Sequence, residues 1–137
     1  MHRYKMLTLA CEGNPKFSVS KIELNRKSIS YSVHTLKRLK LRYGKDAKLF
    51  FLIGADSYND LSSWKEIESA LKLATFVAVS RAGTTSKKGR YGINFIDMPD
   101  VGISSSLIRR RLKASESIKY LVPENVRNFI EEYGVYG

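Results

Sequence analysis

Hydroxyl and guanidinium groups gather at one predicted helix start, formed by Ser104, Ser105 and Ser106 with Arg109 behind them. Ile108 and Leu112 stand on one face of the following segment, so the serines fall where a helix begins. The first N–H groups of a helix have no partner within it, and such an end binds anions. Arg109 lies one turn further in, where its guanidinium can reach a phosphate. A serine-capped surface helix with solvated arginines would show the same pattern.

Two further polar groups follow predicted strands. Gly54 and Asp56 come directly after the apolar run 49–53, and Arg81 follows the apolar segment 76–79. In open α/β sheets, ligands bind outside the carboxyl ends of the strands. Glycine allows close approach of a ligand, and aspartate can bond ribose hydroxyls. Taken alone, each residue is explained as well by a structural role as by ligand binding: Gly54 by a plain turn and Asp56 by a helix cap. Only their convergence on one edge favours a binding site.

The elements that must position these groups alternate along the chain. Helical patterns cover residues 2–12, 30–43, a segment starting at Trp64, a segment from residue 104, and the region after Pro123. Strand patterns cover residues 17–24, 49–53, 76–79 and 93–96. Such alternation predicts a doubly wound α/β domain, with a parallel sheet and helices on both faces. We expect one domain over residues 1–137. Trp64 is either a core residue or a stacking platform for an aromatic ligand.

The composition limits the classes of partner. The net charge of +11 and the pI near 9.8 indicate anionic partners, either nucleic acid or small phosphorylated substrates. The basic residues are spread along the chain without an aromatic stripe, so nucleic acid is not favoured and much of the charge serves solubility. Cys11 is the only cysteine, which excludes an intramolecular disulfide, and we predict no metal site. The lack of a long apolar run predicts no membrane partner, and the single cysteine fits a reducing, cytoplasmic setting.

The order of the motifs resembles the bacterial nicotinate-nucleotide adenylyltransferases, in the nucleotidyltransferase superfamily with its Rossmann-like fold. The matching segments are Ser30-Tyr31-Ser32-Val33-His34-Thr35-Leu36, Gly54-Ala55-Asp56-Ser57 with Trp64, residues 103–109, and Leu121-Val122-Pro123 with Phe129-Ile130. The resemblance covers nearly all of the chain. Ser32 and Ser106 replace threonines of the family's motifs, which keeps the hydroxyl. His34 replaces an aspartate, which removes a carboxylate.

The resemblance implies adenylyl transfer from ATP to nicotinate mononucleotide, which gives nicotinate adenine dinucleotide and pyrophosphate, with Mg²⁺ accompanying ATP. Arg109 would be the catalytic residue. The implied ATP-binding residues are Gly54, Asp56, Ser104, Ser105, Ser106 and Arg109. Trp64 would stack on the nicotinate ring, Thr35 with its neighbours would contact the carboxylate of that ring, and Arg81 would belong to the same subsite. The resemblance implies no covalent enzyme intermediate, so the protein would act by positioning and charge stabilisation.

The chief departure from the family lies at the start of the chain. The family opens with a strand leading into Gly-x-Phe-x-Pro-x-His-x-Gly-His, whose histidines serve the ATP phosphates, whereas Met1 here begins at the family's early helix. In a sheet of order 3-2-1-4-5, the first two strands would lie between segments 17–24 and 49–53, and their edges would be unpaired. We therefore expect an N-terminally truncated nucleotidyltransferase-like domain with little or no catalysis by itself.

Three other interpretations remain open on the sequence. The chain could be a non-catalytic nucleotide-binding module, or a related adenylyltransferase such as the phosphopantetheine type. A basic RNA-binding protein is motivated by the net charge alone. Homo-oligomer formation and the preference between nicotinate and nicotinamide mononucleotides also stay open.

Overall fold

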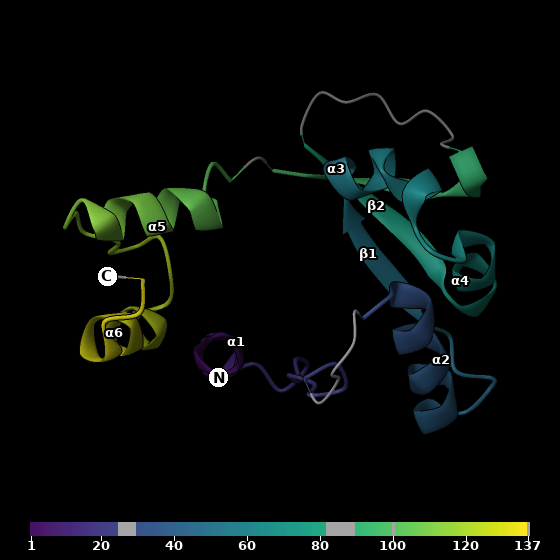
Figure 1. Ribbon diagram of the computed structural model, residues 1–137, viewed down its shortest axis with the longest axis horizontal. Helices are drawn as coiled ribbons and strands as arrows, with labels where there is room; N and C mark the ends of the chain where they lie inside the picture. The colour runs from purple at the N-terminus through teal and green to yellow at the C-terminus, as the bar shows by residue number, and fades with distance from the viewer. Residues whose placement is uncertain (25–29, 82–89, 100, 137) are drawn as a thin grey trace. The chain divides into compact units, whose positions relative to one another are not determined.

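The computed structural model describes residues 1–24, 30–81, 90–99 and 101–136. The helices and strands are α1 (His2–Cys11), α2 (Ser32–Tyr43), β1 (Phe50–Gly54), α3 (Ala55–Asn59), α4 (Ile67–Leu73), β2 (Thr75–Arg81), β3 (Asn94–Met98), α5 (Ser105–Lys113) and α6 (Glu124–Tyr133), with short 3-10 turns η1 (Leu61–Ser63) and η2 (Arg90–Gly92) (Figure 1). None of the described helices is long and apolar enough to span a membrane.

The chain forms two compact units. The sheet unit is continuous in sequence, Lys21–Asp100, whereas the helical unit combines Met1–Ser20 with Val101–Gly137. The sheet unit holds the three strands with α2, α3 and α4, and the helical unit holds α1, α5 and α6. The prediction of a single domain stays a prediction.

The sheet unit is built on a parallel sheet in the order β1-β2-β3. Leu52 pairs with Val77, and Val77 pairs in turn with Asn94. Short apolar runs separated by helices favour this arrangement, because a parallel connection must cross over the sheet. The predicted α/β class with a parallel sheet is therefore confirmed.

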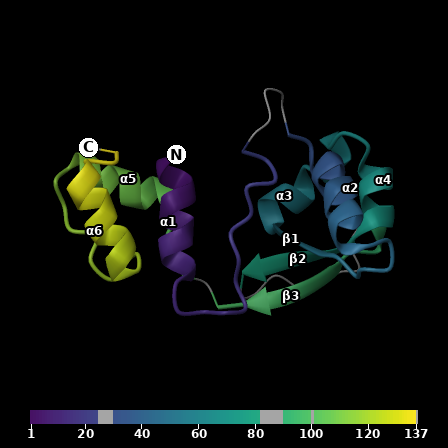
Figure 2. The same ribbon diagram turned by 90° about the horizontal axis from the view of Figure 1, so that it is seen from below.

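One face of this sheet carries the core of the unit. Ile53, Phe76 and Ala78 are buried there, against Val33 and Leu36 of α2. Figure 2 shows α2, α3 and α4 on that face. On the opposite face, Phe50 is 67% exposed and Leu52 is 65% exposed. The other long helices, α1, α5 and α6, belong to the helical unit.

The predicted strand over residues 17–24 is wrong. The segment contains no strand, and its two apolar ends are largely exposed, Phe17 at 64% and Leu24 at 55%. Its backbone instead closes turns, with the Leu24 N–H donating to the Lys21 carbonyl at 3.0 Å. A strand must pair its N–H and C=O groups with a neighbour. Alternation in the sequence does not supply that neighbour.

The helix predicted to begin at Trp64 starts three residues later. The Trp64 N–H donates to the Leu61 carbonyl at 3.0 Å and closes η1. Glu66 then takes a left-handed backbone with φ 53°, and α4 runs from Ile67. The left-handed residue interrupts the helical path, so the Trp64 spacing with Ile67 reflects a shared core and not a shared helix.

The helical unit joins the two ends of the chain. Asn125 of α6 donates its side-chain amide to the Leu9 carbonyl of α1 at 2.7 Å and to Glu12 Oε2 at 3.0 Å. The His2 ring meets the edge of Phe129 at 5.8 Å between ring centroids. Val126 and Ile130 are buried with Ile118. The helices predicted over residues 2–12 and after Pro123 are therefore confirmed.

Candidate functional site

The predicted helix start at the serines is confirmed. Ser104 is the N-cap of α5, and its side chain accepts a hydrogen bond from the Leu107 N–H at 3.1 Å. Ser105 and Ser106 are exposed in the first turn. Arg109 Nη2 donates to Ser106 Oγ at 3.4 Å, which brings the guanidinium over the start of the helix. Hydroxyls, unpaired backbone N–H groups and a cation thus face solvent at one end of α5, an arrangement that suits a phosphate.

The packing of α5 fixes which side chains face that solvent. Ile108 and Leu112 pack against the core of Ile118, Val126 and Ile130. Arg111 is committed to structure, because its Nε donates to the Ser117 carbonyl at 2.8 Å and its Nη1 lies 3.5 Å from Glu116. A cavity of about 150 Å³ adjoins the helix start, lined in part by Ser105 and Arg109. Arg109 is therefore the arginine of α5 that the fold directs to the anion-binding end.

Replacing Ser104 by alanine tests the cap. The Leu107 N–H would lose its acceptor, so we expect the free energy of unfolding of the helical unit to fall by about 1 kcal/mol. Amide hydrogen exchange of α5 measures the change. Ser105→Ala is the matched control, because Ser105 lies inside the first turn and no cap bond involves it. Equal effects of the two substitutions would contradict the capping role.

In the sheet unit, two predicted residues lie at the carboxyl end of β1. Gly54 is the last residue of β1 and the N-cap of α3, and Asp56 lies exposed in the first turn of α3. An added Cβ at Gly54 would meet no atom within 4 Å, and its φ of −77° suits any residue. Neither packing nor backbone strain therefore requires glycine here. What the missing side chain does provide is open space above the strand end, as a ligand would need.

Arg81 ends β2 on the same edge of the sheet. Gly54 pairs with Val79, two residues before Arg81, and Arg81 pairs with Met98 of β3. The backbone of Arg81 is therefore placed with the other strand ends, as the sequence predicts, although it belongs to the strand and does not follow it. Its side chain lies outside the described part of the structure.

Trp64 serves the core and a cavity at once. Its ring meets the rings of Phe51 and Phe76 edge-on, at centroid distances of 6.1 and 6.4 Å. The indole also borders a cavity of about 280 Å³, between the start of α2 and the segment around Ser63. The lining residues are Ser30, Tyr31, Ser32, Val33, Ser63, Trp64, Lys65 and Ala70. We call this the Trp64 cavity. Both interpretations of the single tryptophan thus fit the structure.

Thr35 does not border the Trp64 cavity. Its hydroxyl donates to Glu23 Oε1, which also accepts from Ser30 Oγ at 3.0 Å. A hydroxyl bonded to a carboxylate is poorly placed to receive a second carboxylate. Sequence reasoning missed Lys65, which does line the cavity; its only local signal is its place directly after Trp64.

The predicted site residues fall into two groups. Ser104, Ser105, Ser106 and Arg109 lie together in the helical unit, and Ser106 contacts Arg109. Gly54, Asp56, Thr35, Trp64 and Arg81 lie in the sheet unit. The roles assigned to them stay predictions.

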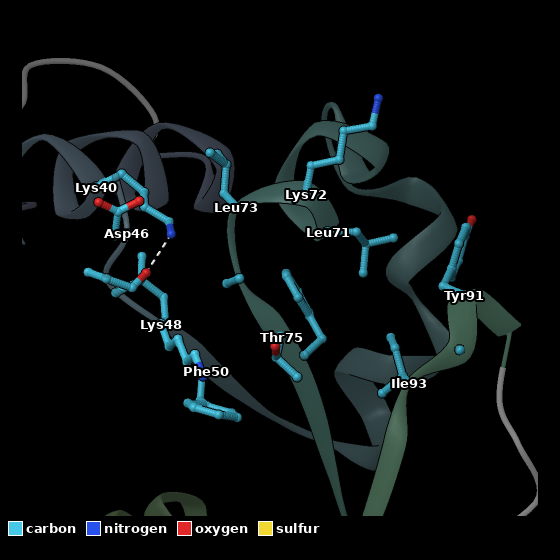
Figure 3. Close-up of a pocket in the computed structure, with 15 residues that line it drawn as sticks. Lys40, Asp46, Lys48, Phe50, Leu71, Lys72, Leu73, Thr75, Tyr91 and Ile93 are labelled. Carbon is cyan, nitrogen blue, oxygen red and sulfur yellow. Dashed lines mark hydrogen bonds between the residues drawn. The ribbon is translucent and has the colours of Figure 1, made fainter. Parts of the chain in front are cut away.

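A larger cavity of about 390 Å³ lies at the opposite edge of the sheet (Figure 3). It adjoins the amino ends of β1 and β2 at Phe50 and Thr75. Lys40 on its border is occupied, since its ammonium donates to the carbonyls of Lys45 and Ala47, and Figure 3 shows Lys72 pointing away from the cavity. None of the predicted site residues lines it. It is therefore distinct from the edge where the sheet rule places a ligand.

The parallel sheet and the capped helix start lie within the part of the chain that matches a known family. The family model described as cytidylyltransferase-like matches residues 1–111. A probable nicotinate-nucleotide adenylyltransferase of Thermus thermophilus is 43% identical over 134 residues, which cover 98% of this chain and 72% of that protein. The nicotinate-nucleotide adenylyltransferase of Bacillus subtilis is 38% identical over 135 residues, 98% of this chain and 70% of that protein. The chain belongs to the nicotinate-nucleotide adenylyltransferase family.

A solved structure supports the fold. The nicotinic acid mononucleotide adenylyltransferase of Plasmodium falciparum, in complex with APC, superposes with a TM-score of 0.77. The match covers 98% of this chain and 74% of that chain, at 21% sequence identity. At this level of identity the likeness concerns the fold, and it confirms the Rossmann-like class.

Proposed function

We propose that this protein transfers the adenylyl group of ATP to nicotinate mononucleotide. The phosphate oxygen of the mononucleotide attacks the α-phosphorus of ATP, the bond to the β-phosphate breaks, and pyrophosphate leaves with the displaced electron pair. The observation that carries the proposal is the α5 start, where Ser105, Ser106 and Arg109 present donors to an anion in a chain of this family. The reaction needs no covalent enzyme intermediate, so positioning and charge stabilisation suffice.

The roles of the side chains follow from their chemistry. Arg109 neutralises charge that develops on the phosphates, and the hydroxyls of Ser105 and Ser106 with the N–H groups of the helix start orient them. Gly54 leaves room for the nucleotide, and Asp56 accepts hydrogen bonds from a ribose.

The acceptor nucleotide is assigned to the sheet unit. Trp64 supplies an aromatic surface for the pyridine ring, and Arg81 supplies a cation at the end of β2. Thr35 keeps its family assignment near the ring's carboxylate on the condition that its hydroxyl exchanges the bond to Glu23 for one to the ligand.

Mg²⁺ is proposed to enter as part of the ATP substrate. Within the described ranges, no group of three or more His, Cys, Asp or Glu side chains could hold an ion. Mg²⁺ commonly binds through substrate phosphates and keeps several waters, so it does not require a protein cage. It would supply charge neutralisation on the transferring phosphates.

The acceptor substrate distinguishes a nicotinate-nucleotide adenylyltransferase from an adenylyltransferase of the phosphopantetheine type. The purified chain is incubated with ATP, Mg²⁺ and either nicotinate mononucleotide or 4′-phosphopantetheine, and both pyrophosphate and the adenylylated product are quantified. We expect the product only with nicotinate mononucleotide, at a rate that rises when the family's N-terminal segment is added to the assay. Binding of ATP and nicotinate mononucleotide without turnover would instead indicate a non-catalytic nucleotide-binding module, and turnover with 4′-phosphopantetheine would indicate the sister specificity.

A further inference from the structure

We propose that two copies of this chain pair through β1, in antiparallel orientation, so that their sheets become continuous. Among the described strands, β1 has a single neighbour, β2, and its other edge is open. An open edge presents unpaired N–H and C=O groups, which accept a further strand. The occupant that we assign to this edge is β1 of a second copy. The inference concerns the sheet unit alone, because β1 belongs to Lys21–Asp100.

The backbone of β1 directs every second residue to the open edge. The Leu49 carbonyl accepts from the Thr75 N–H at 2.8 Å, so the backbone groups of Leu49 point toward β2. Successive residues of a strand point these groups to opposite sides, so those of Phe50 and Leu52 point to the open edge. In an antiparallel ladder, a closely spaced pair of residues exchanges both N–H···O bonds. Phe50 and Leu52 therefore each offer one donor and one acceptor to a second strand.

The sequence of β1 does not protect this edge. Proteins usually protect an edge strand with charged residues, proline or a bulge. The strand, Phe-Phe-Leu-Ile-Gly, has neither a charge nor a proline, and its register with β2 is unbroken. The side chains of Phe50 and Leu52 are 67% and 65% exposed. The strand at the other edge of the sheet, β3, carries the charged Asp97. The edge of β1 is therefore the one that favours a further strand.

The side chains of β1 complement one another about Leu52. A register that places Leu52 opposite Leu52 of the second copy also places Phe50 opposite Gly54, twice by symmetry. Side chains alternate along a strand, so these three positions share one face of the sheet. An added Cβ at Gly54 would meet no atom within 4 Å, so the exposed ring of Phe50 finds open space there. Aromatic residues placed across from edge glycines are a known means of pinning register, and a self-complementary patch suits a two-fold interface.

Charge determines the strength of this pairing. Lys48 and Asp56 are both exposed and lie equally far from Leu52 on opposite sides of it. The same register brings the Lys48 end of one copy to the Asp56 end of the other, so opposite charges flank the interface at both ends. At longer range, the net charge of +11 on each copy opposes association. A short interface between repelling copies predicts a weak dimer, which strengthens when salt screens the repulsion.

The pairing competes with the proposed nucleotide site. Phe50 of the second copy fills the space beside Gly54 that the proposed function gives to the nucleotide, and Asp56 lies at the same end of the strand. The dimer is therefore a resting form that ATP dissociates. This consequence rests on the proposed function, whereas the pairing of β1 does not.

Sedimentation equilibrium of the full 137-residue chain measures the pairing. We expect the weight-average mass to rise with concentration from 15.6 kDa toward twice that value, and to rise at lower concentrations in high salt. Leu52→Lys places two like charges opposite each other on the two-fold axis, so it should raise the dissociation constant at least about tenfold. Leu41→Lys is the matched control, because it adds the same charge at an 85% exposed position of α2 and should leave the constant nearly unchanged.

Disulfide formation tests the register separately. In a Cys11→Ser background, Leu52→Cys places two thiols opposite each other, with Cα atoms about 5.5 Å apart, within the range of about 4.4–6.8 Å that a disulfide spans. Phe50→Cys lies on the same strand and the same face, but its two copies are offset by roughly 13 Å along the strands. On non-reducing electrophoresis after oxidation, we expect a covalent dimer with Leu52→Cys and little with Phe50→Cys.

Three results would overturn the proposal. A chain that stays at 15.6 kDa at every concentration in high salt does not pair, and binding of the family's N-terminal segment to that monomer would assign the edge to that segment. Equal cross-linking of Leu52→Cys and Phe50→Cys would place the contact on another surface. If calorimetry shows ATP binding while the mass of the dimer is unchanged, Phe50 does not occupy the space at Gly54 and the register is wrong. Failure of ATP to bind at all would count against the proposed function and leave the pairing of β1 intact.

Discussion

Replacing Arg109 by alanine is expected to lower the rate of pyrophosphate release, assayed with the family's N-terminal segment present, by a factor of about 10²–10³, the usual loss when one donor to a transition-state charge is removed. The guanidinium lies over the start of α5, where it bonds Ser106 and borders the small cavity with Ser105. In the reaction, negative charge moves toward the leaving pyrophosphate, so a cation held there stabilises the transition state more than the bound substrates. The loss should therefore appear mainly in kcat.

Arg110→Ala is the control for this experiment. It removes the same charge from the neighbouring residue, and Arg110 is exposed in the same helix but points about 100° away around its axis. We expect its rate to stay within about twofold of the wild-type rate, a change that matches less than 1 kcal/mol of activation free energy. Equal losses in the two variants would show that α5 contributes only its general positive field. Arg109→Lys should recover part of the rate, because lysine keeps the charge but loses the bidentate geometry.

Replacing Leu36 by alanine is expected to lower the free energy of unfolding of the sheet unit by about 2–5 kcal/mol. Leu36 of α2 is 1% exposed in the core between α2 and the sheet, and truncation leaves a cavity that its neighbours fill only in part. Urea denaturation followed by the fluorescence of Trp64 measures the change, because Trp64 packs against the same core.

Leu41→Ala, in the same helix, is the matched control. Leu41 is 85% exposed, so its truncation removes little buried area and should change the unfolding free energy by no more than about 0.5 kcal/mol. The packing assigned to α2 would be contradicted if both variants shifted the denaturation midpoint equally. A Leu36→Ala chain already unfolded without urea would place the loss at or above the whole stability of the unit.

Local signals in the sequence were sufficient for several elements. The start of α5 could be predicted because its cap depends on Ser104 and on an N–H three residues away. The apolar run around Phe51 and Ile53 indicated a strand, and the parallel order followed from the alternation with helices. The strand predicted over residues 17–24 is wrong because a strand needs a neighbouring strand to pair with. The alternation of apolar and polar residues in the sequence does not reveal whether that neighbour exists. The short α3 was missed because it follows β1 with no intervening loop.

The candidate site also contains residues that the sequence predicts and one that it does not. Gly54, Asp56 and Arg81 could be placed at one edge of the sheet because strand ends follow from the strand assignments. Lys65 could not be found in this way. Its place at the Trp64 cavity depends on the start of α2 lying beside the segment after η1, and that contact is set by the packing of Val33, Leu36 and Ala70. No spacing rule in the sequence encodes that contact.

The contact between α1 and α6 has a consequence for the order of events during translation. Leu9 and Asn125, which share a hydrogen bond, are 116 positions apart, so at a usual elongation rate of about 5–20 residues per second the ribosome needs about 6–23 s to supply the partner. The sheet unit, continuous in sequence, can fold in that interval. An isolated helix of 10 residues is marginal in water, so α1 should remain largely unstructured on the nascent chain until α6 emerges.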